Sequence, residues 1–457
     1  MSKILLGQGA YERFGLPPAR LVNRYFEATP STSEQVAIMP RPGYGDYSSV
    51  EAEGVIATYR QPGTLDDLTV IVTANAIYSL NSMGVIVGTT PVLNLQPRVS
   101  MTSGAAGVLS LTDGAQLLKL SVAAGETVIT ATPVAFPDFA SCSWVAYLAG
   151  YFIFGRAGSH RVYYLLVGNT VISDFFSAEI APDDLRGGFV LGDSLWLMGE
   201  STVEVWSPTG DATFPFQRQP GLPVDYSLAS RDSVQKLNNA LYFVGADCAI
   251  YEAQGVPQRI SDNAIDARLQ AVNFADLRSW SIEWQGHRFY GLDTGSETLV
   301  FDTSTRRWAN WNSYEEDTFR LKTTCPLGDG RFLGAGDLDG TIYVFGGSTD
   351  AGSPIQRLTT GLIETPPVRC NNVVLQCSVG NAEDHTDDPL IDMRHSDDLG
   401  QTWCDWSPVS LGRLGEYSTR VFWWQRGFMS RVRLFEFRDN NPVDTVIRSA
   451  GYNETIR

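Results

Sequence analysis

The chain has 457 residues, of which 43% are hydrophobic, 11% aromatic and 19% charged. Its 51 Asp and Glu residues outnumber 34 Lys and Arg residues, which gives a formal net charge of −17 at pH 7. Because aromatic residues in this number must pack into a core, the composition excludes a disordered chain, and the acidic balance argues against a general nucleic-acid clamp.

Residues 1–50 are predicted to form an N-terminal arm followed by the first strands. Residues 1–18 contain few core-forming side chains, so we expect this arm to become ordered only on docking to a neighbour. The apolar run near the start is short and lacks a small-residue cleavage site, so no secretory signal is expected. No stretch of eighteen apolar residues occurs, so no membrane span is expected either.

Residues 51–347 show short strand-like segments, rich in β-branched and aromatic residues, that recur with a period of about forty residues. One sheet cannot bury both of its faces alone, whereas radial stacking of such sheets buries them all. We therefore predict a β-propeller-like domain with six or seven blades; an irregular assembly of β-sandwiches is the alternative. The repeats lie at residues 69–87, 107–120, 144–166, 188–206, 233–252, 280–302 and 324–345.

Helical features are confined to residues 263–271, where Asp262 or Ser261 is suited to cap the first turn. After a Gly- and Ser-rich linker, residues 348–457 resume a strand-like pattern without the forty-residue rhythm. This region predicts a C-terminal β-sandwich-like domain that packs on the propeller or completes it. The predicted fold class is therefore all-β.

One motif in the C-terminal region has the S-x-D-x-G-x-T-W pattern of an Asp box, formed by Ser396, Asp398, Gly400, Thr402 and Trp403. Its polar side chains are suited to bond turn amides, and its glycine supplies an unusual backbone angle. A single copy favours a stable hairpin turn. Because Asp boxes recur in sialidases, a glycan-binding or glycan-hydrolysing propeller is kept as the alternative function.

No catalytic, cofactor-binding or metal site is expected. The four histidines and six cysteines lack the spacing of zinc ligands, and no nucleophile elbow occurs. The scattered cysteines are typical of reduced, buried thiols, although a disulfide between Cys370 and Cys377 is an open alternative. His287 is interpreted as a hydrogen-bonded structural residue.

Several phrases, in order along the chain, resemble the tail hub or nozzle proteins of short-tailed bacteriophages, often named packaged-DNA stabilisation proteins. The opening phrase is VNRYFE, the most specific is LWLMGESTVEVW followed by FPFQR, and PQRIS, GHRFY, TRVFW and RVRLF continue the order. Residues 55–140 match little of the family, and Trp424-Gln425-Arg426 stands where a more basic run is usual. The matched residues that we take as candidate interface or family-motif positions are Asn23, Tyr25, Glu27, Trp196, Glu200, Trp206, Phe216, Arg218, Arg259, His287, Arg420, Trp423 and Arg431.

The resemblance implies a non-enzymatic structural protein of the virion tail, assembled in the host bacterial cytoplasm. It implies a hexameric ring below the portal–adaptor protein, with tail spikes or fibres and a distal tail plug as further partners, and double-stranded DNA passing through the lumen without sequence-specific binding.

Two stretches are candidates for contacts between proteins. Exposed aromatic and Arg residues carry most binding energy at interfaces, which favours Arg420, Trp423, Trp424, Arg426 and Arg431. Strand alternation allows Trp423 to be a core residue instead. A loop that connects two blades is expected to contain Asp211, Phe214, Phe216 and Arg218, and a contact between subunits of a ring is the alternative for the same residues.

Overall fold

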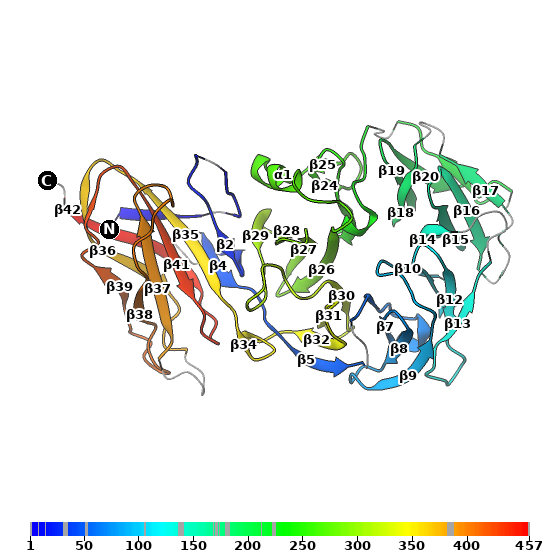
Figure 1. Cartoon of the computed structure of the whole chain (residues 1–457), viewed down its shortest axis with the longest axis horizontal. Coiled ribbons are helices and arrows are strands. Elements are labelled where there is room, and N and C mark those ends of the chain that lie inside the picture. Colours follow the sequence, from blue (N-terminus) through cyan, green and yellow to red (C-terminus); the bar gives the residue numbers. More distant parts are fainter. Residues whose placement is uncertain are drawn as a thin grey trace. The chain divides into compact units, whose positions relative to one another are not determined.

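The structure is a computed structural model. It describes the chain except for residues 1, 8, 14, 31–34, 51–53, 105–106, 136–140, 168, 170–171, 173, 179–182, 212, 222–224, 382–387 and 456–457. Strands make up almost all of the regular secondary structure of the described chain (Figure 1). It divides into two compact units, one of residues 46–283 and 321–344, and the other of residues 1–45, 284–320 and 345–457.

The first of these, the propeller unit, contains five complete antiparallel sheets of four strands each within its described residues (Figure 1). In chain order they are β6 (Ala57–Tyr59), β7 (Thr69–Val72), β8 (Ala76–Leu80) and β9 (Ile86–Pro91); β10 (Ser100–Ser103), β11 (Leu109–Thr112), β12 (Leu117–Ser121) and β13 (Thr130–Pro133); β14 (Cys142–Leu148), β15 (Tyr151–Arg156), β16 (Arg161–Leu166) and β17 (Asp174–Ser177); β18 (Leu185–Leu191), β19 (Ser194–Gly199), β20 (Val203–Pro208) and β21 (Phe216–Arg218); and β22 (Gln235–Leu237), β23 (Ala240–Val244), β24 (Ile250–Ala253) and β25 (Gln258–Arg259).

Two further groups of four strands follow these five sheets. A sixth runs from β26 (Arg278–Trp284) through β27 (His287–Asp293) and β28 (Thr298–Asp302) to β29 (Arg307–Asn310). A seventh contains β30 (Thr323–Pro326), β31 (Phe332–Ala335) and β32 (Thr341–Phe345), with β5 (Tyr44–Ser49) as its fourth strand. The first strands of neighbouring groups contact one another, β10 with β14, β14 with β18 and β30 with β6. The prediction of an all-β propeller with six or seven blades is confirmed.

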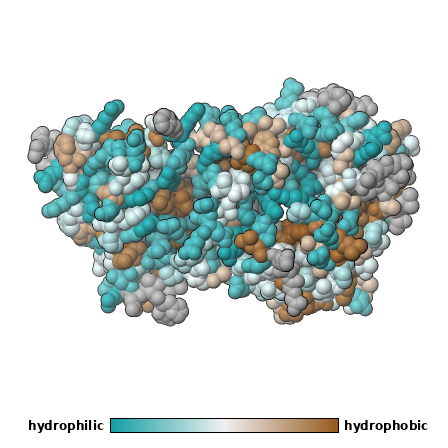
Figure 2. Space-filling model, in the orientation of Figure 1, coloured by the Kyte–Doolittle hydropathy of each residue, from teal (hydrophilic) through white to brown (hydrophobic). Residues whose placement is uncertain are grey.

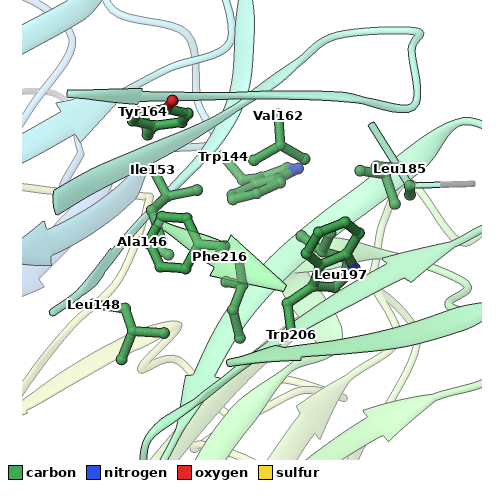
Figure 3. Packing of buried hydrophobic residues seen from close by; sticks show 12 residues of the cluster. Trp144, Ala146, Leu148, Ile153, Val162, Tyr164, Leu185, Leu197, Trp206 and Phe216 are labelled. Carbon is green, nitrogen blue, oxygen red and sulfur yellow. The ribbon is translucent and has the colours of Figure 1, made fainter. Parts of the chain in front are cut away.

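The core between the third and fourth blades shows how adjacent sheets stack. Trp144 on β14 packs among hydrophobic residues of both blades, including Leu197 and Trp206 (Figure 3). A Cβ added at Gly155 would lie 2.0 Å from Trp144 Nε1, and one at Gly188 would lie 2.3 Å from its Cζ3. The two glycines thus make room for the indole, and burial of such apolar surface is the main driving force for stacking the blades.

The one α-helix of the described chain, α1 (Asn263–Leu269), begins at the predicted place. Asp262 is its N-cap, and its carboxylate accepts hydrogen bonds from the N–H groups of Ala264 at 2.8 Å and Ile265 at 2.9 Å. This satisfies two amides that the first turn leaves without intrahelical partners.

The second unit contains a sandwich of two sheets. One sheet has the order β42 (Ile447–Thr455), β36 (Val368–Cys377) and β39 (Val421–Trp424), with β40 (Phe428–Met429) also on β36. The other has β35 (Arg357–Glu364), β41 (Val432–Asp439), β37 (Leu390–Ser396) and β38 (Ser407–Ser410). The C-terminal β-sandwich of the predicted fold class is confirmed.

The first strand joins both sheets of this sandwich. In β1 (Ser2–Leu6), residues 2–4 pair with β42 and residues 5–6 pair with β35. Ile4 is buried within the unit. For residues 2–6, the expectation of an arm that becomes ordered only on docking is therefore wrong, because alternate hydrophobic residues here complete a sheet of the same chain.

The remaining strands of this unit are short. They are β2 (Leu21–Val22), β3 (Arg24–Ala28), β4 (Val36–Pro40), β33 (Thr349–Asp350) and β34 (Ser353–Pro354). β3 pairs with β4 in antiparallel fashion, and β2 pairs with β35. All six cysteines of the chain are free thiols. Among the described residues, no helix has the length and hydropathy needed to cross a membrane.

Figure 2 shows that one face of the molecule is covered mostly by hydrophilic residues, with the hydrophobic ones in small groups. Several of the exposed hydrophobic residues belong to the sandwich, among them Tyr417, Trp424 and Phe428.

Candidate functional site

The motif residues of β3 meet His287 inside the second unit. The Nε2 atom of His287 lies 2.7 Å from Glu27 Oε2, and its Nδ1 atom lies 2.8 Å from Asp302 Oδ2. The ring of Tyr25 packs edge-on against the imidazole with centroids 4.8 Å apart. Burial alone would lower the pKa of His287, but the hydrogen bonds to Asp302 and Glu27 prevail and raise it. The imidazole between these two carboxylates ties β3 to β27 and β28.

Asn23, between β2 and β3, is buried and has a φ of 54°, in the left-handed region. Its Oδ1 atom accepts hydrogen bonds from Arg41 Nε at 2.8 Å and from the N–H of Asn312 at 2.9 Å. Arg41 in turn forms a two-pronged ion pair with Asp350. Asn23 therefore holds together segments that are far apart in sequence, and it is not part of an exposed interface.

The middle motif divides between core and surface. Trp196, Trp206 and Phe216 are buried, and the indole N–H of Trp206 donates to Glu204 Oε2 at 2.9 Å. Glu200 is exposed and pairs with Arg186 at 3.0 Å.

Two motif residues of the propeller unit lie at the ends of strands. Arg218 is exposed at the end of β21, so the expected connecting loop is here the outer strand of a blade, which pairs with β20. Arg259 is exposed on β25 and bonds Asn263 Oδ1 at 2.9 Å at the start of α1.

The sandwich motif alternates along β39. Trp423 is buried and its indole N–H donates to the carbonyl of Ser407 at 2.8 Å, whereas Trp424 is 61% exposed. Arg420 and Arg431 are both exposed. Strand alternation thus assigns Trp423 to the core and leaves its neighbour for the surface.

Around β39 the exposed side chains form one surface, which we call the β39 surface. It contains a hollow of about 580 Å³ on the face of β36, β39 and β42. Within the described strands, β39 stands at the end of its sheet order, so one of its edges has no neighbouring strand. Aromatic and Arg side chains beside a free strand edge are typical of a binding surface. The surface consists of Tyr417, Arg420, Phe422, Trp424, Arg448 and Asn453.

The Asp box forms a closed turn. Asp398 Oδ1 accepts hydrogen bonds from Ser396 Oγ at 2.6 Å and from the N–H of Thr402 at 2.8 Å, and its Oδ2 accepts from Thr402 Oγ1 at 2.6 Å. The hydrogen bonds from Ser396 and Thr402 lower the pKa of Asp398 to about 2. Gly400 has a φ of 92°, and its carbonyl accepts from the Trp403 indole at 3.0 Å. The carboxylate is therefore engaged in holding the hairpin.

Sequence reasoning missed a stack beside this turn. The guanidinium of Arg394 lies 4.4 Å from the ring centres of both Trp403 and Trp406, and that of Arg438 lies 4.0 Å from Trp406. Arg394 lies on β37 and Arg438 lies on its partner strand β41. The Arg and Trp residues can be seen in the sequence, but the strand register that brings them together cannot be read from it.

Two family models match the chain, one after the other. A model described as bacteriophage P22 Gp10, beta-propeller, matches residues 4–346, and one described as bacteriophage P22 Gp10, beta-sandwich, matches residues 356–452. The chain belongs to the bacteriophage P22 Gp10 family. These are tail nozzle or hub proteins of podoviruses, so the resemblance drawn from the motifs is confirmed. The chain is thus a structural protein of a phage tail.

Other comparisons add little. No curated protein matches the chain. Among solved structures, the chain is similar to the β-propeller domain of Cps50 (Swd1) from Myceliophthora thermophila, with 9% identity, a TM-score of 0.47, and coverage of 66% of this chain and 99% of that one.

Proposed function

We propose that the chain forms a ring that serves as the tail hub or nozzle below the portal–adaptor protein. In this role the ring closes the DNA exit channel after packaging, attaches tail spikes or fibres and a distal plug, and lets DNA pass at ejection. The observation that carries the proposal is the match of both family models, in order, over most of the chain. We take the number of six subunits from the family resemblance.

The β39 surface supports the part of the proposal that concerns attachment. Its aromatic and Arg side chains are of the types that dominate interface energies, and they lie on a rigid sheet. We propose that this surface meets another virion component.

The net charge supports a role in guiding DNA. Six copies with −17 each would place about −100 formal charges in one ring. We propose that acidic side chains face the channel, so that the DNA phosphates are repelled and the duplex slides without adhering. The electrostatic potential mapped on an assembled ring tests this, since a basic lumen would refute it.

Electron microscopy of the purified chain, with and without the portal–adaptor complex of the same phage, tests the proposal. We expect rings of six subunits on the adaptor. A chain that stays monomeric in the presence of the adaptor would contradict the proposal, and turnover of fluorogenic glycosides would instead favour the glycan-directed alternative.

A further inference from the structure

One edge of β39 is free of any other strand of the described chain. β39 pairs with β36 on one side, and no described strand pairs with it on the other. β38 belongs to the other sheet of the sandwich, and its Ser407 carbonyl accepts a hydrogen bond from the buried indole of Trp423. This contact runs through the buried face of β39, so it does not occupy the edge of the strand.

The backbone groups at this free edge can be assigned from the strand register. The N–H of Gln425, the residue after β39, donates to the carbonyl of Asn371 on β36 at 2.6 Å. In an antiparallel pair the backbone groups of alternate residues point to the same edge, so those of Trp423 also point to β36. The N–H and C=O groups of Phe422 and Trp424 therefore point outward at the free edge.

Other edge strands of the described chain are protected against pairing, and β39 is not. The outer strands of the five complete blades, and β38 at the end of the other sandwich sheet, each contain a proline or a charged residue. Proteins protect edges in this way because a row of unpaired backbone groups is a template for another chain. The four residues of β39, VFWW, include neither kind. The protecting residues are Pro91, Pro133, Asp174, Arg218, Arg259 and Pro408.

The solvent face beside the free edge offers aromatic rings to an added strand. Phe422 and Trp424 lie on this face with ring centres 4.9 Å apart, and Trp424 is 61% exposed. Both rings border the hollow of about 580 Å³. Every second side chain of an added strand would face the same side, where aromatic and β-branched side chains pair favourably with aromatic ones.

The charge beside the free edge favours an acidic partner. Arg420, which directly precedes β39, is exposed and borders the hollow. It forms no ion pair with another described residue, and no described residue that lines the hollow is Asp or Glu. A carboxylate on an added segment could therefore pair with Arg420 without displacing an existing partner.

We propose that the free edge of β39 accepts an extended segment of another tail protein as an added strand. This inference rests on the proposed function, in which the β39 surface meets another virion component, and it specifies the mode of contact. The segment carries aromatic or β-branched side chains at every second position, facing Phe422 and Trp424, and an acidic residue that reaches Arg420. Main-chain hydrogen bonds to the two outward residues give affinity, and the side chains give specificity.

Hydrogen–deuterium exchange measured by mass spectrometry tests the proposal on three samples. These are the isolated full chain, the ring of this chain on the portal–adaptor complex, and the complete tail of the same phage. We expect the amides of Phe422 and Trp424 to exchange at least about 100-fold more slowly in the complete tail than in the other two samples, because only there are they bonded to an added strand.

Arg420→Gln tests the acidic contact within the same tail. We expect the two amides to exchange about tenfold faster in tails that carry this variant, because a charge-assisted hydrogen bond to the added segment is lost. Arg413→Gln is the matched control, since Arg413 is exposed in the segment that leads to β39 but does not line the hollow. It should leave the exchange unchanged.

Protection of both amides in the complete tail alone, weakened by Arg420→Gln and not by Arg413→Gln, supports the proposal. Amides that exchange equally in all three samples overturn it, even if the Trp424 side chain becomes buried, because such docking would use side chains only. Protection already present in the ring would show that a second copy occupies the edge, and equal effects of the two Arg variants would refute the acidic contact.

Failure of this inference can be distinguished from failure of the proposed function. Exposed amides in a tail that contains the chain overturn the added strand and leave the tail role intact. Absence of the chain from the tail would overturn the proposed function and this inference with it.

Discussion

The core between the third and fourth blades and the interior around β3, β35 and β41 are both buried, but by different means. The first is built from hydrophobic and aromatic side chains around Trp144. The second encloses Arg24 and Arg357, both fully buried, and Asp439 lies between them as a shared ion partner. Both regions bury hydrophobic residues, but the second unit also encloses a buried charge pair that the core around Trp144 lacks.

The charged interior has a specific weakness. Burial lowers the pKa of Arg24, and the carboxylate of Asp439 opposes this effect. A buried pair is costly to break because the remaining charge has lost its water and gains nothing in return. We therefore expect the second unit to respond to the loss of a single charge, and the blades to respond to the loss of volume.

The largest effect is expected for Asp439→Asn. This change keeps the side-chain shape but leaves two buried guanidinium groups without their shared anion, so the free energy of unfolding should fall by about 5 kcal/mol. Urea unfolding followed by tryptophan fluorescence measures it. Asp392→Asn is the control, because its partner Arg438 is partly exposed, and it should cost about 1 kcal/mol or less. Equal losses for the two variants would show that burial does not make this charge pair more costly to break.

Trp144→Ala tests the hydrophobic core between the third and fourth blades. The cavity it leaves between two blades should lower the free energy of unfolding by about 4 kcal/mol, with little dependence on salt. The exposed Trp424, changed to Ala, is the matched control and should cost less than about 1 kcal/mol. A strong salt dependence of the Trp144→Ala effect in urea unfolding would argue against a hydrophobic blade core.

A smaller, pH-dependent effect is expected at His287. Its pKa is raised in the folded chain, so the stabilisation is fully present below the ordinary histidine pKa and is lost as pH rises through the folded value. His287→Gln should cost about 1–2 kcal/mol at pH 6 and less at pH 9. Thermal unfolding across this pH range checks it, and a cost that grows with pH would show that the imidazole is neutral.

The smallest effect is expected at the Asp box. The pKa of Asp398 is lowered to about 2, so its stabilising contribution is present above the ordinary Asp value and is lost as pH falls from about 4 towards 2. Asp398→Asn should therefore differ from the unaltered chain at pH 6 and converge with it near pH 2. Thermal unfolding of both at these two pH values is the measurement, and a difference that persists at pH 2 would contradict the role of the carboxylate.

Local features of the fold were predictable from the sequence. The repeat placed the blades, and the turn at Asn238 and Asn239, both with positive φ, joins β22 to β23 as its residue types indicate. The N-cap of α1 at Asp262 was predictable for the same reason, because its hydrogen bonds reach only to Ala264 and Ile265.

Long-range pairings were not predictable. The place of β1 between β35 and β42 depends on partners more than 350 residues away. Buried arginines such as Arg24 read as surface residues in a sequence, since charge is normally solvated.

Cryo-electron microscopy of the phage tail that contains this chain would show the position and the copy number of the chain in the particle. We expect six copies in a ring below the portal–adaptor, each with a propeller and a sandwich, around a lumen wide enough for duplex DNA. Density for this chain at another position in the particle, or as single copies that form no ring, would contradict it.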